Sequence, residues 1–329
     1  MLVTLNEVTV SYTDKKILDN VSFSINDNDK IGIVGINGTG KSTLLKTILG
    51  EVDIQSGEIF RKSGIKIAYL PQQPKFDENA SIIDTALKES KVDNEYEIKA
   101  MLSKLGIDNL DSKISTLSGG EKRRLALAIT LVKQCDLLIL DEPTNHLDIW
   151  MINWLEKYLT KWSKALLLVT HDRYFLERIT NKIFELDRTK IYEYEANYSH
   201  FLELKAQREE IALSTQRKRK LFLKKELEWV RAGVQARSTK SKDRLQRFEE
   251  LNNQKDIEKI QNVEMLSVSS RLGKKTIELE DVSMSYDHLL FEPFSYHFKR
   301  NDRVGILGKN GCGKSTLLNI IAGIIKPTY

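Results

Sequence analysis

Hydrophobic positions follow two different periods along the chain. At the N-terminus, MLVTLNEVTVSY alternates apolar and polar residues, which is typical of a strand with one buried face. Two apolar runs, KIGIVG at 30–35 and RVGILG at 303–308, predict strands that each lead into a glycine-rich loop and then a helix. Four large apolar residues in a row, Leu137–Leu140, predict a strand buried on both faces within a parallel sheet. The pattern indicates an α/β fold.

Helical periodicity dominates two other regions. Segments near 81–90 and 94–105 predict two short amphipathic helices. From about 197 to 264, glycine and proline are rare apart from RAGVQARST, which predicts two long helices that reverse near Gly233. Apolar positions along 201–230 can then face those along 245–257 in an antiparallel α-helical hairpin.

The chain repeats itself with a period of about 273 residues, which places Ser11-Tyr12 over Ser285-Tyr286 and Lys41 over Lys314. This period is too long for a solenoid, so we expect tandem domains. Because IIKPTY stops where the first copy continues, we expect truncation or proteolysis rather than a natural end. The predicted domains are a first repeat at 1–196 with a helical subdomain at about 74–130, a linker at 197–264, and an incomplete second repeat at 265–329.

Composition narrows the class of protein. The chain has 329 residues, 29% of them charged, and no apolar run approaches the roughly 18–20 residues of a spanning helix, so we expect a cytoplasmic protein that does not enter a membrane. Its two cysteines, Cys135 and Cys312, lie far apart, and the spacing suggests neither a disulfide nor a zinc site.

Positive charge is concentrated in the linker. The segment Lys205–Arg247 holds 14 lysines or arginines against 5 acids, a net charge of +9, although the whole chain is only +5. A basic tip on slender helices suits contact with nucleic-acid phosphates, whereas the alternative is a solvated connector whose charge maintains solubility. The candidate nucleic-acid contacts are Arg231, Arg237, Lys240, Lys242 and Arg244.

Both glycine-rich loops have the pattern of a phosphate-binding loop. Glycines allow the backbone N–H groups and the following helix N-terminus to face a phosphate, the lysine reaches the terminal phosphates, and the next serine, Ser42 or Ser315, ligates magnesium. The first loop contributes Gly35, Asn37, Gly38, Thr39, Gly40, Lys41, Ser42 and Thr43, and the second contributes Gly308, Asn310, Gly311, Cys312, Gly313, Lys314, Ser315 and Thr316.

Two carboxylates end the apolar run at 137–140. Asp141 can hold magnesium through water, and Glu142 lies where a general base for an attacking water is expected. Helix-capping acids before Pro143 are the alternative interpretation, which the buried strand disfavours.

These residues carry a family resemblance. LSGGE at 117–121, LLILDEP at 137–143 and VTHD at 169–172, in this order behind a phosphate-binding loop, resemble the ATP-binding cassette (ABC) ATPases. DEPTNHLD resembles the ABC-F family in particular, whose members are soluble twin-cassette proteins that act on ribosomes. The linker at 224–251 is similar to that of the Uup-like branch of this family.

The resemblance implies ATP and Mg²⁺ as ligands and assigns further roles. Tyr12 and Tyr286 resemble the aromatic residues that stack on adenine, Gln72 the glutamine that couples the γ-phosphate and magnesium to the helical subdomain, and His171 the switch histidine. A register one residue later would assign Gln73 in place of Gln72.

Ser118, Gly119 and Gly120 resemble the signature that contacts the γ-phosphate bound on an opposite cassette, so the resemblance implies composite sites. The Lys41 site lacks an opposing signature, and the Lys314 site lacks its own carboxylates and histidine. We therefore expect weak nucleotide binding and little hydrolysis, unless two first cassettes pair head to tail.

Two functions of different class follow from the resemblance. The favoured one is an ATPase that binds the ribosome and transfer RNA through the basic hairpin and uses ATP as a conformational switch. The alternative is an ATPase that binds branched or duplex DNA. The nucleotide-binding subunit of a membrane transporter is disfavoured, because the chain shows no element to couple it to a membrane domain.

Overall fold

The computed structural model describes residues 1–12, 15–92, 94–231, 277–286, 289–299 and 302–328. The chain divides into two compact units, one formed by Met1–Tyr198 with Arg271–Tyr329 and the other by Ser199–Ser270. In the first repeat the strands are β1 (Val3–Tyr12), β2 (Lys15–Ile25), β3 (Lys30–Val34), β4 (Ser56–Arg61), β5 (Ile67–Leu70), β6 (Leu137–Asp141), β7 (Ala165–Val169), β8 (Lys182–Asp187) and β9 (Lys190–Tyr194). The helices are α1 (Lys41–Leu49), α2 (Ile82–Ser90), α3 (Glu95–Lys104), the 3-10 helix η1 (Ile114–Thr116), α4 (Gly119–Val132), α5 (Ile149–Thr160) and α6 (Arg173–Ile179).

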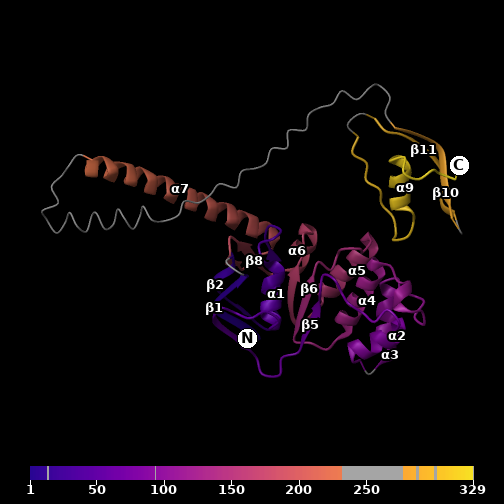
Figure 1. Ribbon diagram of the computed structural model, residues 1–329, viewed down its shortest axis with the longest axis horizontal. Coiled ribbons are helices and arrows are strands. Elements are labelled where there is room, and N and C mark those ends of the chain that lie inside the picture. The colour runs from indigo at the N-terminus through magenta and orange to yellow at the C-terminus, as the bar shows by residue number, and fades with distance from the viewer. Residues whose placement is uncertain (13–14, 93, 232–276, 287–288, 300–301, 329) are drawn as a thin grey trace. The chain divides into compact units, whose positions relative to one another are not determined.

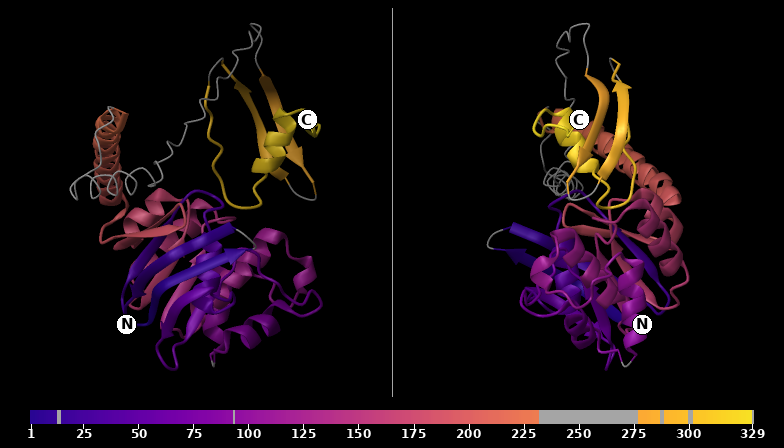
Figure 2. Two further views of the ribbon diagram at one scale, coloured as in Figure 1. Left: turned by 60° about the vertical axis from the view of Figure 1, so that its left-hand side comes forward. Right: turned by 90° about the vertical axis from the view of Figure 1, so that its right-hand side faces the viewer.

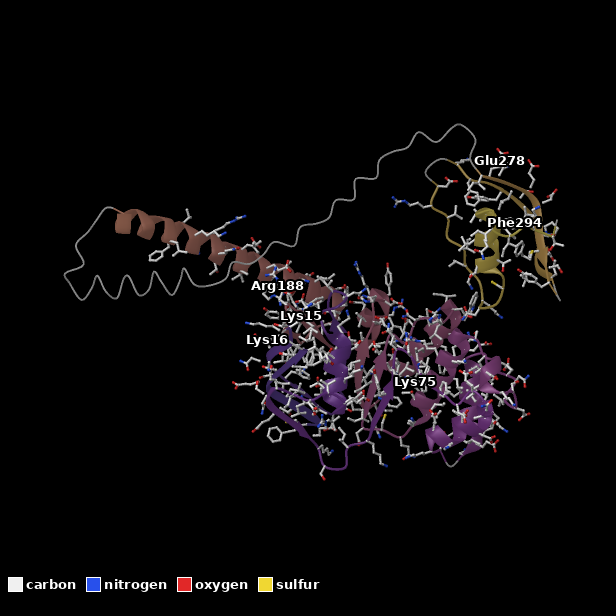
Figure 3. The ribbon with its side chains drawn as sticks, viewed as in Figure 1. Lys15, Lys16, Lys75, Arg188, Glu278 and Phe294 are labelled. Atoms are coloured by element: carbon white, nitrogen blue, oxygen red, sulfur yellow. The ribbon has the colours of Figure 1, made fainter. Side chains whose placement is uncertain are left out.

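Two sheets form the framework of the first repeat (Figures 1 and 2). The smaller is antiparallel, with the order β2-β1-β4. The larger has the order β5-β6-β7-β3-β8-β9, in which β9 alone runs antiparallel to its neighbour. Strand β2 is an edge of the smaller sheet and begins with Lys15 and Lys16, whose charges oppose pairing with another chain (Figure 3).

Strand β6 shows why four apolar residues follow one another. Leu137 and Ile139 belong to a core that strands β1, β2 and β3 share with helix α1. Leu138 and Leu140 belong to the other core, which the helices α2 to α6 cover. Because successive side chains of a strand point to opposite faces, a strand buried on both faces needs apolar residues at every position.

The helical subdomain follows its sequence signals. Helices α2 and α3 lie within one residue of the predicted segments 81–90 and 94–105. Ser81 caps α2 by accepting a hydrogen bond from the N–H of Asp84, and Asn94 caps α3 by accepting from the N–H of Tyr96. These caps satisfy backbone donors that a helix start otherwise leaves unpaired.

The second unit contains a single described helix, α7 (Tyr198–Arg231), 34 residues long (Figure 1). It corresponds to the first helix predicted for the linker. The predicted reversal near Gly233 and the second helix lie outside the described residues, together with Arg237, Lys240, Lys242 and Arg244.

The second repeat contains strands β10 (Glu278–Ser285) and β11 (Leu289–His297), which pair antiparallel, and helix α9 (Lys314–Ile321). Its small core is built from Leu279, Val282, Met284 and Ile320, against which Phe294 packs (Figure 3). The core leaves apolar side chains uncovered, since Leu307 is 88% exposed.

The strand predicted for RVGILG at 303–308 is wrong, because residues 302–309 form no strand. The matching strand β3 lies between β7 and β8, and both supply its hydrogen bonds. Within the described part of the second repeat, only β10 and β11 form a sheet. An apolar run becomes a parallel strand only where neighbouring strands satisfy its backbone groups.

Candidate nucleotide site

The arrangement of the large sheet creates the site. Strands β5, β6, β7 and β3 are consecutive neighbours and run parallel, so their carboxyl ends share one edge. Gln72, Asp141 and His171 lie at or just after the ends of three of these strands, and the first glycine loop follows β3. Ligands of open α/β sheets bind at such an edge.

A cavity of about 550 Å³ lies at this edge and brings together most of the predicted residues of the first repeat. Those that line it are Tyr12, Asn37, Gly38, Gly40, Lys41, Ser42, Thr43, Gln72, Asp141, Glu142 and His171. Of the two adjacent glutamines, it is Gln72 that lines the cavity, and Gln73 does not. Three further residues also line it, Ile17, Asn145 and Val169. Asn145 and Val169 belong to the DEPTNHLD and VTHD motifs, whereas the sequence carried no signal for Ile17.

The first glycine loop has the backbone that a phosphate cradle requires. Gly38 and Gly40 adopt φ values of 83° and 104°, a region that residues with a side chain rarely occupy. A Cβ at Gly35 would lie 2.6 Å from the carbonyl oxygen of Leu186, so only glycine fits there. The Nζ of Lys41 donates to the carbonyls of Gly35 at 2.7 Å and Ile36 at 3.2 Å.

Burial lowers the pKa of Lys41, and the carboxylates of Glu142 and Asp141 oppose this shift. The lysine charge is therefore held close to both acids. Gly35 and Thr39 do not line the cavity but support the loop, since the Thr39 hydroxyl donates to the Ile36 carbonyl at 2.8 Å.

The second glycine loop repeats this geometry. Gly311 and Gly313 have φ values of 82° and 91°, and the Nζ of Lys314 donates to the carbonyls of Gly308 at 2.8 Å and Lys309 at 2.6 Å. A Cβ at Gly308 would meet the Cys312 sulfur at 2.5 Å. The remaining predicted residues of this repeat are placed as follows: Asn310 in the loop, Ser315 and Thr316 in the first turn of α9, and Tyr286, 58% exposed, just after β10.

Asp141 and Ser42 form a pair suited to a hard cation. Asp141 is 3% exposed, and burial, followed by the charge of Glu142, raises the pKa of its carboxyl. Arg123, Lys41 and a hydrogen bond with the Ser42 side chain act in the opposite direction. Magnesium prefers such oxygen donors, and a divalent charge would offset the burial of the carboxylate. Ser42 and Asp141, with Gln72 on the same cavity wall, therefore fit the predicted metal.

Glu142 is held in an unusual backbone conformation. Its φ is 52°, in the left-handed region, and its N–H donates to the carbonyl of Val169 at 2.8 Å. Its carboxylate lies 3.5 Å from Nε2 of His171. Such strain costs on the order of 1–3 kcal/mol and persists where the surrounding structure enforces it, often at functional sites.

Arg123 is a site residue that sequence reasoning missed. It is 7% exposed, lies in α4, and its guanidinium donates to the carbonyls of Asp141 and Glu142, each at 2.8 Å, and also to that of Gln72. It therefore ties the helix that begins at the LSGGE motif to the backbone of three cavity residues. Its position, two residues beyond that motif, was the only available signal.

The signature residues do not line the cavity of their own repeat. Ser118 caps α4 by accepting a hydrogen bond from the N–H of Glu121 at 3.3 Å, and the Glu121 carboxylate accepts from the N–H of Ser118 at 2.9 Å. Ser118 and Gly119 are exposed, and a Cβ at Gly119 would meet nothing within 4 Å. The first residues of α4 therefore carry no bulky side chain. The part of this helix start in a composite site stays a prediction.

Helix α7 presents basic side chains to solvent, since Arg217, Lys218 and Lys220 are all exposed. Of the predicted nucleic-acid contacts only Arg231, the last residue of α7, lies within a described element. None of the described helices is both long enough and apolar enough to span a membrane.

A cavity built from a glycine loop, a buried aspartate, a neighbouring glutamate and a histidine at one sheet edge defines a P-loop nucleotide-binding cassette. Comparison with known proteins agrees with this class. A family model described as ABC transporter matches residues 18–145 and 291–329, which together are half of the chain, and a second model with the same description matches 184–267. The chain belongs to the ABC transporter family.

Relatives refine this assignment. The chain is 41% identical to the uncharacterized ABC transporter ATP-binding protein YfmR of Bacillus subtilis, over 95% of this chain and 56% of that protein. It is 35% identical to the energy-dependent translational throttle protein EttA of Mycobacterium tuberculosis, over 98% and 66%, and 36% identical to the ATP-binding protein Uup of Buchnera aphidicola, over 99% and 57%.

These relatives confirm the predicted resemblance to ABC-F type proteins. Because EttA and Uup are about equally similar to the chain, the Uup-like branch stays a prediction. The chain spans 56% to 66% of the length of these relatives.

A solved structure titled as the ATP binding subunit of an ABC transporter shows the same fold. Its TM-score is 0.54 at 23% identity, over 59% of this chain and 90% of that one. The α/β cassette with a helical subdomain is thereby confirmed.

Proposed function

We propose that the chain is part of an ABC-F type ATPase that uses ATP binding and hydrolysis as a conformational switch while its basic linker binds RNA of the ribosome or bound transfer RNA. The observation that carries the catalytic part is the single cavity in which Lys41, Ser42, Gln72, Asp141, Glu142 and His171 meet.

Each of these residues has a task that its surroundings support. Lys41 exchanges its two loop carbonyls for the terminal phosphates. Glu142 accepts the proton of the attacking water, and His171, 3.5 Å from it, contacts the γ-phosphate. Ser42, Asp141 and Gln72 would hold the magnesium ion, whose charge would offset that of the phosphates.

The general base gives the first test. Glu142→Gln keeps the shape of the side chain but removes its basicity, so turnover should fall by about a hundredfold or more while nucleotide binding remains. Release of inorganic phosphate measures turnover, and retention of a fluorescent ATP analogue measures binding. Unchanged phosphate release would show that another group accepts the proton.

The composite site gives a second test, for which the chain supplies its own control. If two first cassettes pair head to tail, Lys41→Ala and Ser118→Arg each inactivate every site. A mixture of the two variants restores one intact site in each mixed pair, and should recover about a quarter of the unmodified rate. Full activity of a demonstrably monomeric Ser118→Arg chain would refute the composite site.

The RNA part rests on the concentrated basic charge of the linker, on the exposed basic residues of α7, and on the translational role in the name of the relative EttA. Phosphate contacts should make binding weaken with salt, at a log-log slope of roughly −0.7 to −0.9 per phosphate neutralised. Replacement of Arg231, Arg237, Lys240 and Lys242 with alanine should abolish cosedimentation with ribosomes.

Lys15 and Lys16, exposed lysines of β2, are the matched control, because their replacement with alanine removes positive charge elsewhere. Unchanged cosedimentation of the linker variant at physiological salt would refute RNA binding by the linker. Sequencing the nucleic acid that copurifies with the Glu142→Gln chain in ATP decides the target, and recovery of DNA alone would favour the DNA-binding alternative.

A further inference from the structure

A second hollow lies on the helical subdomain and shares no lining residue with the nucleotide cavity. It has a volume of about 550 Å³ and lies between residues of α3, the end of α4, and α5 with the residues just beyond it. A neighbouring cavity of about 510 Å³ shares four of its residues, namely Glu97, Val132, Lys133 and Gln134. The two cavities therefore adjoin along one wall.

Aromatic rings dominate the first of these cavities. Trp154, Tyr158 and Trp162 recur every four residues, with ring centroids 5.4 Å apart for the first pair and 6.0 Å for the second. Tyr96 on α3 adds a ring that is 76% exposed. Such rings offer flat apolar faces to a planar ligand.

The simplest alternative is that these aromatic residues only seal the edge of the core, against which three of them pack. The indole N–H of Trp162 argues against a purely structural role, because it is buried and donates to no described residue. A buried donor without an acceptor costs about 1–3 kcal/mol, and a ligand oxygen would supply that acceptor if the indole turned its N–H toward the cavity that Trp162 lines.

Charge on the two cavities is uneven. Within the described chain, the only acids that line them are Glu89 and Glu97. They face five lysines, namely Lys66, Lys91, Lys104, Lys133 and Lys164. None of the five ammonium groups forms an ion pair with a described residue. The combined walls therefore have an excess of unpaired positive charge beside an aromatic hollow.

We propose that the two cavities together bind one small ligand that joins a flat aromatic ring system to a phosphate, the chemistry of a nucleoside monophosphate. The ring lies among the aromatic residues, and the phosphate lies near Lys133, which both cavities share. Gln134, also shared, offers an amide to the polar edge of the ring. The aromatic cavity, at about 550 Å³, has the volume and apolar wall of a small-molecule site, and the more polar second cavity supplies the lysines for the anionic part of the ligand.

The location connects this site to the rest of the cassette. The ligand would contact the C-terminal end of α4 and the residues that lead into β6. The opposite ends of these two elements carry the signature residue Ser118 and the metal candidate Asp141. The site is nevertheless independent of the proposed function, since its test requires neither hydrolysis nor RNA.

The test uses the full chain with Lys41→Ala and Lys314→Ala, which weaken nucleotide binding to both glycine loops. AMP, GMP and UMP are titrated separately by isothermal calorimetry, with inorganic phosphate as a fourth probe. We expect at least one nucleotide to bind at one site per chain with a dissociation constant below about 1 mM, and phosphate alone to bind at least about tenfold more weakly.

Two substitutions locate the binding. Ala100→Phe on α3 fills the aromatic cavity, and Lys133→Glu reverses the shared charge, so each should weaken binding at least about tenfold. Lys157→Glu, an exposed lysine of α5 that lines neither cavity, is the matched control and should stay within about twofold. Thermal melting of each variant verifies folding.

The proposal is overturned if no nucleotide binds, or if Ala100→Phe and Lys133→Glu both fold and bind as the parent does. Binding of single-stranded RNA at this site without any binding of mononucleotides would also overturn it, because the occupant would then be a strand.

Discussion

Arg123 carries the sharpest prediction about the candidate site. Its guanidinium is buried and donates to the carbonyls of Gln72, Asp141 and Glu142. Hydrogen bonds of a charged group contribute about 1.5–3 kcal/mol each, and Arg123→Ala would leave three carbonyls without this donor. Part of this is offset, because the Nε–H of Arg123 is itself buried without a partner among the described residues. We therefore expect a loss of about 3 kcal/mol in the free energy of unfolding.

Urea denaturation followed by circular dichroism measures this loss. With an m-value of about 1–3 kcal/mol per molar urea, the midpoint should fall by about 1–3 M. Arg123→Lys keeps the charge, but the single ammonium group of lysine cannot reach all three carbonyls. This variant should therefore lose less unfolding free energy than Arg123→Ala, yet more than none. The same variants should bind nucleotide more weakly, because the backbone that positions Gln72 and Asp141 loses its anchor.

The control is Arg178→Ala, which removes an arginine whose side chain is 62% exposed and whose partner is Glu156. Its midpoint should not differ measurably from that of the parent. The reasoning is refuted if Arg123→Ala unfolds at the same urea concentration as Arg178→Ala.

Three further predictions follow from the same structure. Folding raises the pKa of Asp141, so between the pKa of the unfolded chain and that of the folded chain only the folded state keeps this proton, and stability falls as pH rises through this interval. Asp141→Asn should therefore raise the melting temperature of the nucleotide-free chain near neutral pH, by a difference that shrinks on acidification. An equal or lower melting temperature would contradict this. Burial raises the pKa of Cys135 to about 11, whereas Cys312 is exposed. Ellman's reagent at pH 8 should therefore label Cys312 rapidly and Cys135 only in denaturant, and rapid labelling of both thiols would count against the described burial. Gly40 has a φ of 104°, and Gly40→Ala adds a Cβ that collides with a side chain of β2, so it should destabilise the fold by about 1–3 kcal/mol. Gly64→Ala, with φ 73° and open space around it, is the control and should cost about 1 kcal/mol. Equal melting temperatures of the two variants would refute the steric contribution.

Much of the first repeat could be predicted from local patterns. The glycine loop before α1, the buried strand β6 and the caps of α2 and α3 each combine a residue type with a short spacing that permits few conformations. Gln72 lines the cavity, whereas its neighbour Gln73, which fitted the same motif, does not. Such features depend on contacts within a few residues, so the sequence alone contains their cause.

Other features depend on residues far apart in the sequence. Arg123 contacts carbonyls that lie 18 to 51 positions away, and no local pattern marks an arginine that bonds to distant backbone. The apolar run at 303–308 shows the converse, since the same pattern that forms β3 forms no strand there. A strand exists only where neighbours accept and donate its hydrogen bonds.

The sequence by itself therefore determined which segments have the pattern of a phosphate-binding loop, which carboxylates end the buried strand, and where positive charge is concentrated, because each depends on residue type and near spacing. Only the tertiary structure decided that the ends of β5, β6, β7 and β3 meet at one edge, and that aromatic residues of α5 line a hollow together with α3 and lysines that form no ion pair within the described chain. The physical reason is that strand order and helix packing are chosen by burial and backbone pairing across the whole domain.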